Sequence, residues 1–288
     1  MPVISSSYAR LTAVHPAVRV ITGSPRSGGG WVPARDLAAG GAAVTEHVGW
    51  GAERLTRDHG RRPRPDVAAT WGLHRYLWPA CLLFTVPWFL TRRVPRLPVT
   101  AVSVHRATGR MTVRPEGFAC LPGDPAARLP GARIVPTKEA LRGELRAALA
   151  EHVAPLLDAF GPLLRRGPRA LWGMATDEVA EGLWYVAGLL GAGEAERARR
   201  ELTELLPGGT PPFAGGARFH RAVPTGRTGG DQPPGRPDQK TDAPSPRPET
   251  GRTRLTCCLF YTVNPAAACA GCPRRQTGGG IDHRAPAT

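Results

Sequence analysis

The sequence predicts an α+β protein that is mainly helical, with a helical body, one β-hairpin and a small cysteine segment near the C-terminus. Hydrophobic residues recur at helical spacing through residues 137–206, and residues 99–115 alternate as in a hairpin. A proline- and glycine-rich stretch, residues 223–253, separates this body from four clustered cysteines. With 288 residues, of which 41% are hydrophobic, the chain can bury a large core.

Residues 1–65 are predicted to form short helices in glycine- and proline-rich surroundings. Apolar residues recur there at helical spacing, namely Val44, Val48, Ala52 and Leu55. The stretch GSPRSGGGW at residues 23–31 is expected to be a loop. It lacks the Gly-Lys-Ser/Thr ending of a phosphate-binding P-loop, so we do not expect it to bind a nucleotide.

The helical body is assigned to residues 66–222. A helix is expected from Asp66 to about Trp78, followed by the apolar run LWPACLLFTVPWFL at 77–90. This run is too short to span a membrane and contains two prolines, so we expect a buried helix or strand and no membrane span. Period-two alternation on both sides of a glycine-containing turn predicts the hairpin at 99–115.

Three further helices are predicted in the second half of the body. The first follows Thr137, which suits an N-cap, and carries an apolar stripe: Leu141, Leu145, Ala148, Leu149, Val153, Leu156, Leu157 and Phe160. The second begins near Pro168 and ends near Gly191, in agreement with the preference for proline in the first turn and glycine at the end. The third, residues 194–206, is short and charged.

Residues 223–253 are predicted to be a disordered linker. They contain no aliphatic residue larger than alanine after Val223 and cannot bury a core. The cysteine segment is assigned to residues 254–276, and a flexible polar tail to residues 277–288.

The net charge of +15 does not by itself predict a nucleic-acid-binding protein. All but two of the 38 basic residues are arginines, and they are scattered instead of lining one helix or stripe. We expect no nucleic-acid partner, although the positive surface favours encounter with an acidic redox protein. The N-terminus lacks a secretory pattern, so the expected location is the reducing cytoplasm.

No group of residues outside the cysteine segment is predicted to form a catalytic site. His74 and His152 are isolated, the latter beside Glu151 in an expected solvated turn, and Asp177-Glu178 is expected to be exposed helical charge. The large aromatic residues are expected in the core and not as ligand-stacking groups: Trp71, Trp78, Trp172, Trp184 and Tyr185. The two remaining cysteines are expected to be inert core residues: Cys81 and Cys120.

The four clustered cysteines, Cys257, Cys258, Cys269 and Cys272, are candidate ligands of a metal centre. Structural zinc usually takes two Cys-x-x-Cys pairs, and only Cys269 and Cys272 have that spacing. Neighbouring side chains of an extended chain point to opposite faces, so Cys257 and Cys258 converge poorly on one ion. A 2Fe-2S cluster spreads its ligands over two irons. Spacing alone leaves open an iron–sulfur cluster, zinc, and disulfides or free thiols.

The arrangement Cys-Cys-x10-Cys-x2-Cys near the C-terminus resembles the bacterial ferric-siderophore reductases, which reduce iron bound by hydroxamate siderophores. Leu259 and Tyr261, the ALWG sequence at residues 170–173, and the order of helices in 137–206 add to this resemblance.

The resemblance implies a cytoplasmic enzyme whose four cysteines hold a 2Fe-2S cluster. Its substrate would be a ferric siderophore of the hydroxamate type, reduced by one electron to release Fe(II). No dinucleotide-binding pattern is present, so the electrons are expected from a separate donor protein. The alternative is a non-enzymatic siderophore- or partner-binding helical protein with structural zinc at the same cysteines.

Overall fold

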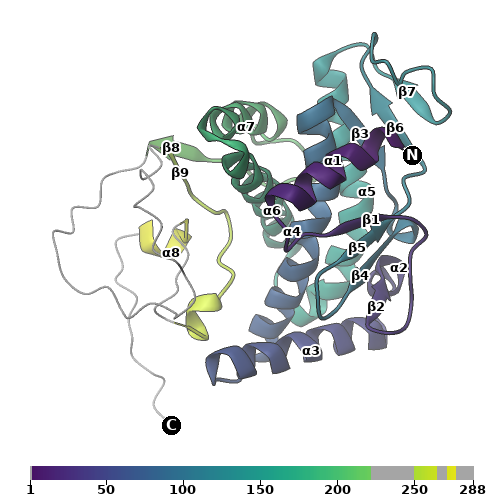
Figure 1. Cartoon of the computed structure of the whole chain (residues 1–288). Coiled ribbons are helices and arrows are strands. Elements are labelled where there is room, and N and C mark those ends of the chain that lie inside the picture. Colours follow the sequence, from purple (N-terminus) through teal and green to yellow (C-terminus); the bar gives the residue numbers. More distant parts are fainter. Residues whose placement is uncertain (1, 222–249, 265–270, 277–288) are drawn as a thin grey trace.

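The computed structural model describes residues 2–221, 250–264 and 271–276. It confirms the α+β, mainly helical class: long helices surround a shared core, and small sheets lie at its edges (Figure 1). The core draws on both ends of the body, since Ile4, Tyr8 and Leu11 belong to the same buried cluster as Leu202.

Helix α4 (Pro65–Thr91) is the central element of the body and packs against α1 (Pro2–Val14), α3 (Gly41–His59), α5 (Lys138–Leu164) and α6 (Pro168–Leu190). It is one continuous helix and includes the apolar run at 77–90, which the sequence left open as helix or strand. Pro87 cannot donate to the carbonyl of Leu83. The hydroxyl of Tyr8 on α1 donates to that carbonyl instead, at 3.0 Å, so a neighbouring helix satisfies the oxygen that proline leaves without a partner.

The three helices predicted in the second half of the body are confirmed. The hydroxyl oxygen of Thr137 accepts a hydrogen bond from the N–H of Ala140 at 3.1 Å and caps α5. Helix α6 starts at Pro168 as expected and is followed by α7 (Ala192–Leu205). Among the residues described, no helix combines the length and apolar character needed to cross a membrane.

The predicted hairpin is part of a four-stranded sheet ordered β1-β5-β4-β2. Strands β4 (Val102–His105) and β5 (Met111–Val113) pair antiparallel, while β1 (Val20–Thr22) joins parallel to β5 and β2 (Trp31–Pro33) antiparallel to β4. The expected loop at 23–31 therefore connects two strands. Short helix α2 (Ala34–Ala38) follows β2, and a 3-10 turn, Val99–Ala101, precedes β4.

A second sheet has the order β3-β6-β7: Arg93–Arg96, Gly117–Cys120 and Ala132–Ile134. Strand β6 pairs antiparallel with β3 and parallel with β7. Cys120 lies in this sheet and Cys81 in α4, and both are buried. Burial raises the pKa of each thiol, in keeping with inert core cysteines.

The boundary predicted for the linker requires a correction. Residues 223–249 lie outside the described residues, as does the tail at 277–288. Thr250–Arg252, however, form strand β9, which pairs antiparallel with β8 (Phe219–Arg221). The chain is thus attached to the helical body before the first cysteine, and the attachment starts within the stretch that we predicted as linker.

The expectation of a solvated turn at His152 is wrong. The ring is completely buried: one nitrogen lies 2.8 Å from the hydroxyl of Tyr76, and the other 2.7 Å from the carbonyl oxygen of Leu97. Burial lowers the pKa of His152 to about 4, so the ring is neutral and serves as a hydrogen-bonding core residue.

Candidate metal centre in the cysteine segment

Three of the four candidate ligands lie in the described part of the chain: Cys257, Cys258 and Cys272. Cys257 and Cys258 are partly exposed, and Cys272 is buried. Burial raises the pKa of Cys257, and the thiols of Cys272 and Cys258 raise it further because their negative charges are close by. Cys269 lies outside the described residues.

Cys257 and Cys272 form no disulfide bond. Within the described ranges, no three His, Cys, Asp or Glu side chains converge closely enough to be identified as a metal site.

The backbone turns sharply after the cysteine pair. Leu259 adopts a left-handed conformation (φ 61°), and a 3-10 turn, Phe260–Thr262, follows. This turn directs the N–H of Leu259 toward the sulfur of Cys257, 3.4 Å away. A backbone N–H donated to a thiolate sulfur is a common feature of iron–sulfur sites and stabilises the reduced, more negative state.

Buried ion pairs attach the cysteine segment to helix α6. Asp177 and Glu178 are 0% exposed, so the expectation of exposed helical charge is wrong. The carboxylate of Asp177 accepts hydrogen bonds from the guanidinium of Arg252 at 2.6 Å and from the N–H of Leu255 at 2.8 Å. It also accepts from the N–H and the hydroxyl of Thr256, both at 2.9 Å. One side chain of the body thus fixes the backbone directly before Cys257.

Glu178 extends this network to helix α4. Both of its oxygens lie 2.9 Å from Nδ1 of His74, so this histidine is not isolated as the sequence suggested. Arg254 donates to Glu178 at 3.1 Å and contacts the carboxylate of Glu181 at 2.8 Å. We call the six residues of this network the buried latch: His74, Asp177, Glu178, Glu181, Arg252 and Arg254.

A signal for the buried latch was present in the sequence but was not recognised. Arg252 and Arg254 are two residues apart in an extended stretch, which places their side chains on the same face. Asp177 and Glu181 are four apart on α6 and also share a face. Matching arginine and carboxylate pairs in two distant segments indicated a contact, whereas each pair viewed alone resembled ordinary surface charge.

Two glycines allow the close approach that the buried latch requires. A Cβ atom on Gly173 of α6 would lie 3.0 Å from the methyl carbon of Thr256. A Cβ atom on Gly271 would lie 2.6 Å from the carbonyl oxygen of Arg252, a distance that backbone atoms cannot accommodate. The carbonyl of Gly271 also accepts a hydrogen bond from the N–H of Arg254 at 2.9 Å. Hence the stretch leading to Cys272 packs on the residues that precede Cys257.

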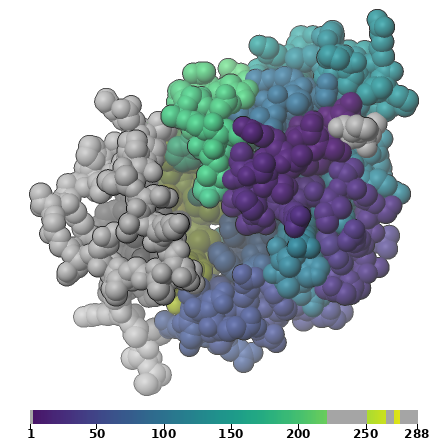
Figure 2. Space-filling model, in the orientation of Figure 1, coloured from purple at the N-terminus to yellow at the C-terminus, as the bar shows by residue number. Residues whose placement is uncertain are grey.

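Aromatic stacking forms a second attachment, to helix α4. Phe260 stacks on Trp71 with ring centroids 5.0 Å apart and planes at 20°, and His59 of α3 meets Phe260 edge-on at 5.3 Å. Trp71 therefore forms part of the surface of α4 on which the cysteine segment packs. In Figure 2 the yellow atoms of the segment lie directly against the helical body.

Positive charges surround the thiols. The guanidinium of Arg166 donates to the carbonyl oxygen of Cys257 at 2.7 Å. Arg274 lies over the ring of Tyr261, 5.1 Å from its centroid, and its charge opposes the effects that raise the pKa of Cys257. A backbone donor to sulfur and nearby guanidinium groups fit a negatively charged, thiolate-bound cluster.

Replacing Asp177 with Asn is expected to weaken attachment of the cysteine segment. The substitution keeps the size of the side chain but leaves Arg252 without its buried counter-charge, which costs about 3–5 kcal/mol of unfolding free energy. Chemical denaturation under anaerobic conditions measures this loss.

The matched control is Glu196→Gln, which removes the carboxylate of an exposed ion pair with Arg199 on α7. It is expected to cost much less stability than Asp177→Asn, because solvent screens an exposed ion pair. Equal stabilities of Asp177→Asn and Glu196→Gln would contradict the structural role assigned to the buried latch.

The pair formed by His74 and Glu178 is expected to make stability depend on pH. Burial lowers the pKa of His74, but the charge of Glu178 outweighs this effect and the pKa lies above its ordinary value. The stabilisation is therefore complete below the unfolded-state pKa of about 6.5 and is lost as the pH rises through the raised folded-state pKa. Burial raises the pKa of Glu178, but His74 and Arg254 lower it overall, so Glu178 stays charged over this range.

Melting temperatures of the wild type and of His74→Gln, recorded from about pH 5.5 to about pH 9, provide the measurement. The melting temperature of the wild type is expected to exceed that of His74→Gln by an amount that shrinks as the pH rises. A difference in melting temperature that stays constant or grows with pH would show that the charged pair does not contribute to stability.

Comparison with known proteins identifies the cysteine segment. No curated protein matches the chain. Residues 254–274 match the family model described as the FhuF 2Fe-2S C-terminal domain, and this range begins at Arg254 of the buried latch and contains all four candidate cysteines. The resemblance found in the sequence is thereby confirmed over these residues. Residues 254–274 are thus similar to the FhuF 2Fe-2S C-terminal domain, and the cofactor of this segment is a 2Fe-2S cluster.

Proposed function

We propose that the chain is a ferric-siderophore reductase, which passes one electron to Fe(III) in a hydroxamate-type siderophore and releases Fe(II) in the cytoplasm. The observation that carries this proposal is the 2Fe-2S domain match at residues 254–274, on a segment attached to a helical body by buried ion pairs. A firmly attached redox segment suits electron delivery to a substrate held by that body.

The proposed cluster ligands are Cys257, Cys258, Cys269 and Cys272. When bound, a 2Fe-2S cluster supplies one electron at a time, as the reduction of Fe(III) to Fe(II) requires. Clusters held only by cysteine reach about −400 mV in plant-type ferredoxins, the low range needed for tightly chelated Fe(III). Hydroxamate oxygens are hard donors that favour Fe(III), so reduction weakens the chelate and frees the metal.

The chain's own residues position the ligands for this task. Asp177 holds the backbone at Leu255 and Thr256, and Arg166 holds the carbonyl of Cys257. Leu259 donates its N–H to the sulfur of Cys257. These contacts fix the cysteine pair on α4 and α6 before electron transfer, so that little rearrangement is needed when the charge changes.

Electrons are proposed to come from a separate protein. A net charge of +15 favours an acidic donor, because long-range attraction speeds encounter between oppositely charged surfaces.

Cys272→Ser is the substitution that tests the proposed ligands. Anaerobically purified wild type is expected to be red-brown, to contain acid-labile sulfide and to show a paramagnetic signal once its cluster is reduced. It is also expected to reduce a ferric trihydroxamate. Cys272→Ser is expected to lose the sulfide and the reductase activity together, because a 2Fe-2S cluster needs its four protein ligands.

Cys81→Ala and Cys120→Ala are the matched controls, since both residues are buried in the body and are expected to keep the cluster. A colourless wild type with one zinc per chain would instead favour the structural-zinc alternative. Retention of the cluster in Cys272→Ser would exclude this residue from the ligand set.

A further inference from the structure

A cavity of about 340 Å³ lies beside the buried latch. Its lining comes from four segments: His15 after α1, two residues of α4, two of α6 and one of the cysteine segment. The α4 and α6 pairs are each four residues apart, so each pair lies on one helix face. The six lining residues are His15, His74, Trp78, Glu181, Tyr185 and Arg254.

One wall of the cavity is aromatic. The ring of His15 meets Trp78 and Tyr185 edge-on, with centroids 5.5 Å away in both cases, and Trp78 and Tyr185 are 5.9 Å apart. Tyr185 is 48% exposed, which corrects the expectation that it is a core residue. An exposed aromatic ring supported by two others is a rigid surface for a partly apolar ligand.

The rest of the lining is polar, and one buried donor in it makes no hydrogen bond. Arg254 is only 7% exposed, and its Nε lies 3.9 Å from Oδ2 of Asp177 without a hydrogen bond, whereas Oε2 of Glu181 lies 2.8 Å from a terminal nitrogen of Arg254. Glu178 occupies Nδ1 of His74, so contact between His74 and a ligand would come from Nε2. A buried donor without a partner is costly, and an oxygen-rich ligand in the cavity would supply the missing acceptor.

The cavity includes a residue of the cysteine segment, because Arg254 lines it. His74 also lines it, and both side chains interact electrostatically with Cys258: burial lowers the pKa of each, whereas the negative charge of Glu178, and that of Cys258, raises it.

The charges of the lining largely cancel. Arg254 is paired with Glu181 at 2.8 Å, and His74 with Glu178 at 2.9 Å. This balance suits a ligand without net charge. Three singly charged hydroxamates neutralise Fe(III), whereas three doubly charged catecholates leave a complex with three negative charges.

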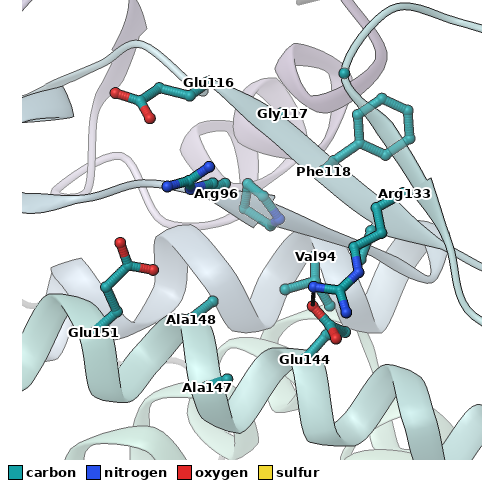
Figure 3. Close-up of a pocket in the computed structure, with 13 residues that line it drawn as sticks. Val94, Arg96, Glu116, Gly117, Phe118, Arg133, Glu144, Ala147, Ala148 and Glu151 are labelled. Carbon is teal, nitrogen blue, oxygen red and sulfur yellow. Dashed lines mark hydrogen bonds and ion pairs between the residues drawn. The ribbon is translucent and has the colours of Figure 1, made fainter.

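A second cavity, of about 430 Å³, offers a contrast (Figure 3). It lies between α5 and the β3-β6-β7 sheet, and Arg133 reaches across it to Glu144 at 3.1 Å. None of its lining residues belongs to the cysteine segment or to the aromatic wall.

We propose that the cavity lined by His15, His74, Trp78, Glu181, Tyr185 and Arg254 binds the ferric chelate, with one face of an uncharged trihydroxamate complex stacked on the aromatic wall. This inference rests on the proposed function and places its substrate against the cysteine segment at Arg254.

The Ga(III) trihydroxamate complex is the probe, because Ga(III) has the charge of Fe(III) but is not reduced under these conditions. Calorimetric titration into the cluster-loaded full chain gives its Kd without any turnover. Tyr185→Ala is expected to weaken binding about tenfold through loss of the stacking ring, and His15→Ala to weaken it in the same direction. Tyr185→Phe keeps the ring and is expected to bind within about twofold of the wild type.

Leu129→Ala is the matched control. The exposed fraction of Leu129, 44%, is similar to the 48% of Tyr185, but Leu129 does not line the cavity. Its substitution is expected to leave the Kd unchanged. The Ga(III) tris-catecholate complex is expected to bind more weakly than the trihydroxamate. Circular dichroism of each variant verifies that the fold is retained.

Wild-type Kd values in both Tyr185→Ala and His15→Ala would overturn the cavity assignment, as would absence of binding to the wild type. Equal binding of the tris-catecholate would overturn the assignment to an uncharged chelate. The proposed function has a separate readout, since a wild type that contains the cluster and reduces ferric trihydroxamate remains a reductase whatever the Ga(III) titration shows.

Discussion

The carboxylate of Asp177, enclosed between helix α6 and the residues before Cys257, is the constraint on which the site depends. A buried carboxylate is costly unless its lone pairs are satisfied and its charge is compensated. Asp177 meets both conditions through Arg252, the N–H groups of Leu255 and Thr256, and the hydroxyl of Thr256. The directionality of these bonds fixes the register of the cysteine segment on the helix, which apolar packing alone would specify less sharply.

The buried latch also connects the parts of the proposed reaction. Arg254 contacts Glu178 and Glu181 on α6, and it lines the cavity assigned to the iron chelate. His74 joins Glu178 to helix α4. In the proposed reaction, the electron donor group and the substrate would therefore be held by the same few side chains. In this arrangement, a change that loosens the latch is expected to affect attachment of the cysteine segment and binding of the chelate together.

Local patterns in the sequence predicted most of the helical body and the identity of the C-terminal segment. The apolar stripe after Thr137, Pro168 at the start of α6, and the alternation around residues 99–115 each depend on neighbours within a few residues. The cysteine spacing was equally local, and the family match confirms the interpretation as a 2Fe-2S domain. The candidate ligand Cys269 is outside the described residues, so the complete set stays a prediction.

What the sequence did not predict depends on long-range contacts. Helix α4 continues through Pro87 because Tyr8, far away in the chain, satisfies the carbonyl of Leu83. Asp177 and Glu178 are buried because Arg252 and Arg254 compensate their charges, and β9 forms because β8 supplies a pairing edge. From the sequence alone, a charged residue can be exposed or lie in a buried ion pair, and a short segment can form a strand or a loop. The contacting partner decides between these outcomes.

Hydrogen exchange at the backbone amides of Leu255 and Thr256 tests the central claim most directly, since both N–H groups donate to the buried carboxylate of Asp177. In the cluster-loaded chain, the account predicts that these two amides exchange as slowly as amides in the middle of α6, because exposure requires opening of the buried latch. Exchange at the rate of an unprotected loop would contradict it, for the segment would then not be held on the helical body.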